Sequence, residues 1–175
     1  METPTILPHW NQAASLEEWD PDAIEAAQRL VELLMSRLSV VTVEHIGSTA
    51  VPGCAGKGVL DLMVLYPAGR LEETRNLLDA LGFQRQTSRD PFPEERPMGT
   101  GAIAHQGKLF RIHAHVIAQD SPEVGELRRF RNRLRADEEL RKAYVAKKRA
   151  ILEQGITDPL DYSNAKGEFI REEVR

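Results

Sequence analysis

The sequence contains a single cysteine, Cys54, among 175 residues. No intramolecular disulfide can form, and no zinc site can be built from several thiolates. No apolar run approaches the roughly 20 residues that a membrane-spanning helix needs. The first ten residues have neither the basic start nor the apolar centre of a signal peptide. These absences predict a soluble, cytoplasmic protein with no membrane partner.

Aromatic residues are also few, and acidic residues outnumber basic ones by 27 to 23. Aromatics make up 6% of the chain and the net charge is −4. Proteins that bind nucleic acids use a basic field and a stacking surface, so both values disfavour a nucleic-acid partner. Hydrophobic residues at 41% and charged residues at 29% are ordinary for a globular protein. We expect one domain over residues 1–175, with an extended lead-in at 1–14 and a helical part at 121–175.

Local patterns predict the secondary structure. Apolar periodicity indicates helices from the Asp20–Pro21 cap to about residue 38 and at 71–81, 122–135, 137–154 and 163–173. β-branched or alternating stretches indicate strands at 40–46, 59–65, 83–87 and 109–118. Residues 88–101 contain three prolines and two glycines, which predicts a surface loop. The order of the elements predicts an α/β (α+β) fold, a mixed β-sheet with packed helices and a helical C-terminal segment.

A Gly-Ser turn and a carboxylate carry the main functional signal. Gly47 and Ser48 follow a strand, and glycine lets the backbone approach a phosphate while successive N–H groups bind it. Asp61 lies in an apolar strand, where a carboxylate is costly unless it faces a metal or cation or is hydrogen-bonded. Together they are typical of nucleotidyltransferases, in which the turn binds a triphosphate and the carboxylate binds Mg²⁺. The alternatives are a plain tight turn and a structural carboxylate.

Two histidines extend this candidate site. His113 and His115 alternate with apolar residues, so both side chains point to one face of their strand. Neutral imidazoles bind metals and charged ones pair with phosphate. We predict Asp61, His113 and His115 as catalytic residues and Asp61 and His115 as metal ligands, with structural histidines as the alternative. His45, just before the turn, is predicted to orient it.

Several separated motifs resemble the GrpB family. The segment 44–53 with Lys57 and Asp61 resembles that family's hallmark, and residues 113–116 resemble its His-x-His-Val strand. Ten positions in the helical half also match, namely Phe130, Arg131, Leu134, Arg135, Tyr144, Lys148, Tyr162, Lys166, Phe169 and Ile170. The resemblance covers most of residues 40–172 and implies a nucleotidyltransferase-like fold.

Basic residues are the remaining candidates for binding phosphate. Lys57 lies near Asp61 in the sequence, and Arg131 shares one side of its helix with Arg128 and Arg135. Lys148 and Lys166 are added because they match family positions. Together the predicted phosphate or nucleotide contacts are Gly47, Ser48, Thr49, Lys57, Arg131, Lys148 and Lys166. For each basic side chain, a solvated surface position is the alternative.

One departure from the nucleotidyltransferase pattern bears on activity. The second carboxylate usual two residues after the first is here Met63, and histidines stand where a third is expected. One aspartate with two histidines favours a transition metal over Mg²⁺, or no metal at all. For an active protein the expected cofactor is a divalent metal, either Mg²⁺, Mn²⁺ or another transition metal. The leading hypothesis is a nucleotide-binding protein that transfers a nucleotidyl group from an NTP to an acceptor. The alternatives are a non-catalytic nucleotide-binding or interaction module and a metal-dependent phosphoester hydrolase; in each case the partner is a nucleotide or another phosphate-bearing small molecule.

Overall fold

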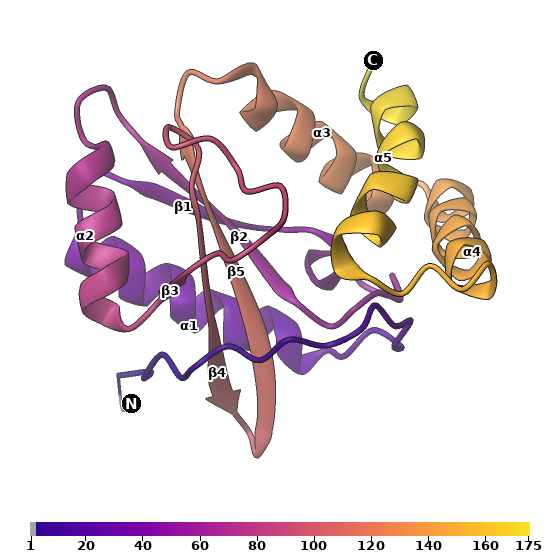
Figure 1. Cartoon of the computed structure of the whole chain (residues 1–175), viewed down its shortest axis with the longest axis horizontal. Coiled ribbons are helices and arrows are strands. Elements are labelled where there is room, and N and C mark those ends of the chain that lie inside the picture. Colours follow the sequence, from indigo (N-terminus) through magenta and orange to yellow (C-terminus); the bar gives the residue numbers. More distant parts are fainter. Residues whose placement is uncertain (1–2) are drawn as a thin grey trace.

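A computed structural model describes residues 3–175, so the first two residues of the expected lead-in at 1–14 lie outside the described range. The elements in chain order are α1 (Asp22–Arg37), β1 (Thr42–Ile46), the short 3-10 helix η1 (Ser48–Ala50), β2 (Leu60–Tyr66), α2 (Leu71–Leu81), β3 (Gln84–Arg85), β4 (Met98–His105), β5 (Lys108–Ala118), α3 (Pro122–Ala136), α4 (Glu138–Glu153) and α5 (Pro159–Val174) (Figure 1).

The strands form one mixed sheet. Within residues 3–175 its order is β1-β2-β5-β4-β3, with β2 and β5 parallel and the other neighbours antiparallel. The expected mixed sheet with packed helices is therefore confirmed. The parallel pair lies in the middle of the sheet, so residues far apart in sequence become direct neighbours there.

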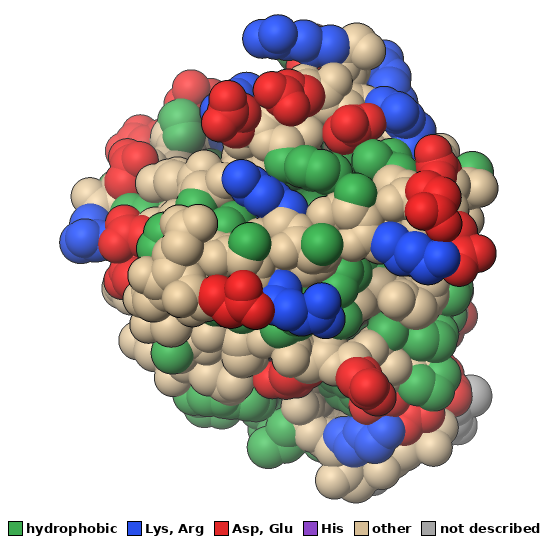
Figure 2. Space-filling view, turned by 90° about the vertical axis from the view of Figure 1, so that its right-hand side faces the viewer, with side chains coloured by type: hydrophobic (Ala, Val, Ile, Leu, Met, Phe, Trp, Pro, Cys, Tyr) green, Lys and Arg blue, Asp and Glu red, His purple; other side chains and the backbone are tan. Residues whose placement is uncertain are grey.

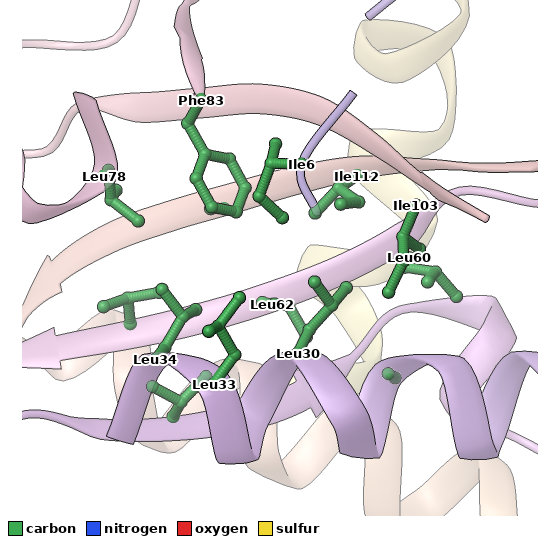
Figure 3. Close-up of a cluster of buried hydrophobic side chains, with 14 of the residues drawn as sticks. Ile6, Leu30, Leu33, Leu34, Leu60, Leu62, Leu78, Phe83, Ile103 and Ile112 are labelled. Carbon is green, nitrogen blue, oxygen red and sulfur yellow. The ribbon is translucent and has the colours of Figure 1, made fainter. Parts of the chain in front are cut away.

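One face of the sheet carries the main hydrophobic core. Leu30 and Leu34 of α1 point to the sheet and meet Leu62 of β2, and all three are fully buried (Figure 3). Each buried leucine of this kind contributes roughly 1.5–3 kcal/mol. Leu78 of α2 and Phe83 close the same core at the other edge (Figure 3). Side chains alternate between the two faces of a strand. Since Leu62 of β2 points into this core, the neighbouring Asp61 points to the opposite face of the sheet.

The opposite face is only partly covered by apolar packing. Val124 of α3 packs on Met63, Leu65 and Ile117, which covers one end of β2 and β5. The helices α4 and α5 pack beside α3 through a separate cluster that includes Tyr144. At the other end of these strands Asp61, His113 and His115 remain between 15% and 27% exposed. Polar residues occupy this end.

The lead-in is extended and paired along its length. Leu7 forms an antiparallel bridge with Ala102 of β4, with N–O distances of 2.8 and 2.9 Å. Ala14 donates to the carbonyl of Thr157, and Glu17 bridges Gly56 further on. The segment therefore runs past the sheet to the helical half of the chain (Figure 1).

Two sequence predictions were wrong at their boundaries. Residues 98–101, expected in a surface loop, begin strand β4 and are buried. Gly99 and Gly101 lower strand propensity, but a Cβ on Gly101 would lie 2.7 Å from Ile6, so close packing explains the glycine. The last helix begins at Pro159 rather than residue 163, because the Asp158 side chain accepts hydrogen bonds from two backbone amides there.

Candidate functional site

Strand register brings Asp61 and the two histidines together. In the parallel pair, Asp61 lies opposite His113, and Met63 lies opposite His115. Oδ1 of Asp61 is 3.2 Å from Nε2 of His115 and 3.4 Å from Nδ1 of His113. The three predicted catalytic residues therefore form one cluster, with their ligand atoms within 4.8 Å of one another.

The hydrogen bonds of His115 identify its tautomer. Nη1 of Arg96 lies 3.0 Å from Nδ1 of His115, and a guanidinium only donates. Nδ1 must accept, so Nε2 carries the hydrogen and donates it to Asp61. Glu123 holds Arg96 in place at 2.6 Å. His115 is thus the hydrogen-bond donor that orients the carboxylate.

The same contacts set the charge of the cluster. Burial alone would raise the pKa of Asp61, but hydrogen bonds from His113 and His115 outweigh it and hold the pKa well below its usual value. Burial lowers the pKa of His115 despite the attraction of Asp61. The cluster therefore presents an ionised carboxylate beside a neutral imidazole.

The Gly-Ser turn lies directly against this carboxylate. Gly47 adopts φ 75° and ψ −176°, a combination that essentially only glycine tolerates. A Cβ at Gly47 would lie 2.7 Å from Oδ2 of Asp61. Ser48 begins η1 immediately afterwards. Glycine is therefore required here both by the backbone conformation and by the approach of Asp61.

His45 and Thr49 fasten the turn to the sheet. The Thr49 hydroxyl donates to the carbonyl of Val59 at 2.9 Å, so it must accept from Nε2 of His45, which lies 2.8 Å away. Burial lowers the pKa of His45 to about 4 and keeps the ring neutral. This geometry supports the orienting role predicted for His45, and it makes Thr49 a structural contact.

A small cationic pocket adjoins the turn and Asp61. Its volume is about 60 Å³. The lysines predicted from the sequence line it together with residues of the turn and two tyrosines; the lining is Gly47, Ser48, Thr49, Gly56, Lys57, Gly58, Val59, Asp61, Tyr144, Lys148, Tyr162 and Lys166.

The three lysines of the pocket differ in their partners. Lys148, only 1% exposed, donates to Ser48 Oγ at 2.9 Å and to the Ala55 carbonyl, and it contacts Cys54. Lys57 and Lys166 lie over the Tyr162 ring, 5.5 and 5.1 Å from its centroid. Burial lowers the pKa of Lys57 and of Lys148 to about 8 each, and also lowers that of Lys166. Lys148 positions Ser48, whereas the other two face the pocket.

Arg131 lies outside this pocket lining. Its guanidinium pairs with Glu44 at 3.0 Å and donates to the His45 carbonyl at 3.1 Å, and Arg128 pairs with the same carboxylate. Glu44 lies opposite Met63 in the sheet. The carboxylate nearest to the position of Met63 is therefore already neutralised by two arginines.

Sequence reasoning missed three residues that surround the histidines. His9 of the lead-in lies with its ring centroid 5.7 Å from that of His113. Phe92 and Arg96, from the expected surface loop, contact His115. No local pattern indicates these contacts, because each depends on a loop or terminal segment folding across the sheet.

The ligand atoms of this cluster fit a transition metal better than Mg²⁺. Mg²⁺ prefers oxygen ligands, and this cluster offers one carboxylate and two imidazoles, which suits a transition metal better. His115 could bind an ion through Nε2 only if Arg96 ceased to donate to Nδ1. Asp61 and His113 are the residues that fit an ion in the present arrangement.

The fold is that of the proteins with a nucleotidyltransferase-like fold. One similar structure is that of Cid1 in complex with its short product ApU, with a TM-score of 0.51 and 16% identity over 75% of this chain and 41% of that chain. At this identity the likeness concerns the fold alone.

The chain belongs to the GrpB family, which confirms the resemblance noted in the sequence. The family model, described as GrpB protein, matches residues 13–175. UPF0157 protein SCO7215 of Streptomyces coelicolor is 38% identical over 133 residues, which cover 74% of this chain and 65% of that relative. The crystal structure of conserved protein GrpB from Enterococcus faecalis has a TM-score of 0.73 and 22% identity over 91% of this chain and 94% of that chain.

Proposed function

We propose that this chain is a nucleotide-binding protein that transfers a nucleotidyl group from an NTP to an acceptor. Gly47 and Ser48 would hold phosphates, with the lysines of the pocket supplying positive charge. The observation that carries the proposal is how near the Gly47–Ser48 turn lies to Asp61: a Cβ on Gly47 would be 2.7 Å from Oδ2, and both line one pocket. Cid1, whose structure was solved with its product ApU, has a similar fold, and this likeness of fold motivates the choice of a nucleotide as the ligand to test.

In the proposed reaction, the acceptor, the leaving group, the base and the ion each have a defined part. An acceptor hydroxyl would attack the α-phosphorus, the bond from that phosphorus to the bridging oxygen would break, and pyrophosphate would leave. His113 would take the hydroxyl proton, because both ring nitrogens of His115 are already hydrogen-bonded. A divalent ion held by Asp61 would supply further positive charge to the phosphates. His113 would not ligate that ion while it acts as the base, because a metal-bound imidazole has no free nitrogen to accept a proton.

The ligand is proposed to be a small molecule rather than a nucleic acid. On the face shown in Figure 2, which looks onto the α4 and α5 side of the molecule, Lys and Arg side chains are interspersed with Asp and Glu. Such a surface provides no continuous basic field for a phosphate backbone on that side. In the described part of the chain, no helix is both long and apolar enough to cross a membrane.

Isothermal titration with ATP, GTP, CTP and UTP, each with Mg²⁺ or Mn²⁺, tests the binding claim. We expect at least one NTP to bind the wild-type protein, and Asp61→Asn to reduce the metal-dependent part of the affinity. Asp90→Asn is the matched control, because Asp90 is exposed in the loop that follows β3. Absence of binding by all four NTPs would remove the nucleotide claim.

A specific observation favours a second candidate, a non-catalytic nucleotide-binding module. Met63 is fully buried in apolar packing and Glu44 is paired with two arginines, so neither position supplies a second free carboxylate beside Asp61. Two-metal phosphoryl transfer relies on clustered carboxylates. Pyrophosphate release with the nucleotide joined to an acceptor would support the transferase. Orthophosphate release, or pyrophosphate release with a free nucleoside monophosphate, would support the hydrolase alternative. Binding without turnover would support the module.

A further inference from the structure

Two lysines face the pocket without a carboxylate in salt-bridge contact, although Asp61 attracts both from a greater distance. Within residues 3–175, neither Lys57 nor Lys166 has a carboxylate within 4.0 Å, and their recorded contacts are with the Tyr162 ring. The neighbouring carboxylate is Asp61, which two imidazoles already hold. Two ammonium groups close to each other and partly removed from water repel, and this repulsion is relieved when an anion lies between them.

The hydroxyl of Tyr162 is a second, independent sign of a ligand. Tyr162 is completely buried, it lines the pocket, and its oxygen has no hydrogen-bond partner in the described residues. A buried hydroxyl without a partner costs about 1–3 kcal/mol and is rare in native proteins. A ligand oxygen in the pocket would accept its hydrogen.

The size of the pocket limits what can enter. A water-sized group needs about 10–15 Å³, so the pocket of about 60 Å³ holds roughly four to six of them. That space suits a phosphate group and is far too small for a ribose and a base. A larger pocket of about 160 Å³ shares Ser48 and Thr49 with this one, and Glu17, Glu18, Asp20 and Lys108 line it. Lys108 pairs with Asp20 at 2.8 Å, so Glu17 and Glu18 leave this pocket with negative charge, which repels a polyphosphate chain.

We infer that this pocket recognises the phosphate end of its ligand alone, through Lys57, Lys166 and the Tyr162 hydroxyl, so that its ligand class is phosphate-terminated small molecules irrespective of nucleobase. The inference rests on the proposed function, because it places the phosphates in the same pocket. It goes further because it holds that the protein does not recognise the nucleobase.

Titration with tripolyphosphate, the four NTPs and adenosine tests this directly. We expect the dissociation constants of the four NTPs to lie within about threefold of one another. Tripolyphosphate should bind at least as tightly as ATP, and adenosine should not bind. A base preference above about tenfold, or binding of adenosine, would overturn the inference, since a base would then be seated elsewhere, for example in the acidic pocket.

Substitutions assign the binding to the named residues. Lys57→Met and Lys166→Met should each weaken tripolyphosphate binding by about tenfold or more, whereas Lys147→Met, which removes an exposed lysine of the same helix as Lys148, should leave it unchanged. Unchanged binding in both pocket variants would contradict the assignment.

Tyr162→Phe separates a ligand contact from a structural one. Removing an unpaired hydroxyl should leave the melting temperature the same or higher, while tripolyphosphate binding weakens by about five- to tenfold. A lower melting temperature with unchanged binding would show that the hydroxyl serves the fold instead.

The outcomes distinguish this inference from the proposed function. Binding of tripolyphosphate without binding of any NTP would remove the nucleotide proposal and leave the inference standing. Binding of NTPs with a strong base preference, without binding of tripolyphosphate, would remove this inference and leave the nucleotide proposal standing.

Discussion

At the scale of single residues, Gly47 is the position where backbone and carboxylate constrain each other most. Gly47→Ala would combine an unfavourable backbone conformation with a Cβ 2.7 Å from Oδ2 of Asp61. We expect a loss of about 1–3 kcal/mol in the free energy of unfolding together with loss of NTP binding. Gly69→Ala is the control: it has a similar positive φ of +79°, but nothing lies within 4 Å of the added Cβ. Equal effects of the two substitutions on binding would contradict the role of Gly47.

The His45–Thr49 contact makes a prediction about acid stability. The pKa of His45 falls from 6.5 to about 4 on folding, so the unfolded chain binds more protons between these values. The neutral His45 ring therefore makes its full contribution to the free energy of unfolding above pH 6.5. This contribution decreases as the pH falls towards 4, by as much as about 3 kcal/mol. His45→Gln keeps a donor for Thr49 without titrating. Chemical denaturation of both proteins at pH 7.5 and 4.5 should show a smaller acid loss for the variant; equal losses would contradict this.

At the scale of elements, the contact between the lead-in and β4 holds His9 over the histidine cluster. Gly101→Ala would place a Cβ 2.7 Å from Ile6 and disturb the neighbouring bridge between Leu7 and Ala102. We expect faster hydrogen exchange at the Leu7 amide and a loss of about 1–3 kcal/mol in stability. Gly125→Ala, in a helix with open space around the added Cβ, should instead stabilise the protein by about 0.5–1 kcal/mol. An unchanged exchange rate at Leu7 would show that this packing does not hold the segment.

The elements also show how far sequence reasoning reaches. Periodicity predicted α1, β2 and α2, and the alternation along 109–118 correctly placed His113 and His115 on the polar face, because these patterns follow directly from which side each residue buries. Strand β4 was missed because its glycines are required by close tertiary packing, which the local sequence does not reveal. His9 and Arg96 also depend on tertiary contacts, so local patterns could not identify them.

At the scale of the whole molecule, an acidic chain concentrates positive charge in one pocket. The net charge is −4, yet Lys57, Lys148 and Lys166 line a cavity that contains Asp61 as its acidic group. The pKa values of Lys57 and Lys148 lie at about 8, so both ammonium groups lose their protons as the pH rises through that value. Tripolyphosphate binding should therefore weaken between about pH 7.5 and 9.5, with proton uptake on binding near pH 8. Titration calorimetry in buffers of different ionisation enthalpy measures the affinity and the proton uptake. An affinity that does not change with pH would contradict the assignment of the lysines.

The central claim is that the Gly47–Ser48 turn and Asp61 receive the phosphates of a nucleotide at a single point. A crystal soaked with a non-hydrolysable NTP analogue and Mn²⁺ tests it most directly. We expect phosphate oxygens within hydrogen-bonding distance of the Ser48 backbone amide and anomalous density for manganese beside Asp61. An ordered nucleotide bound elsewhere, with this pocket filled by water alone, would contradict it.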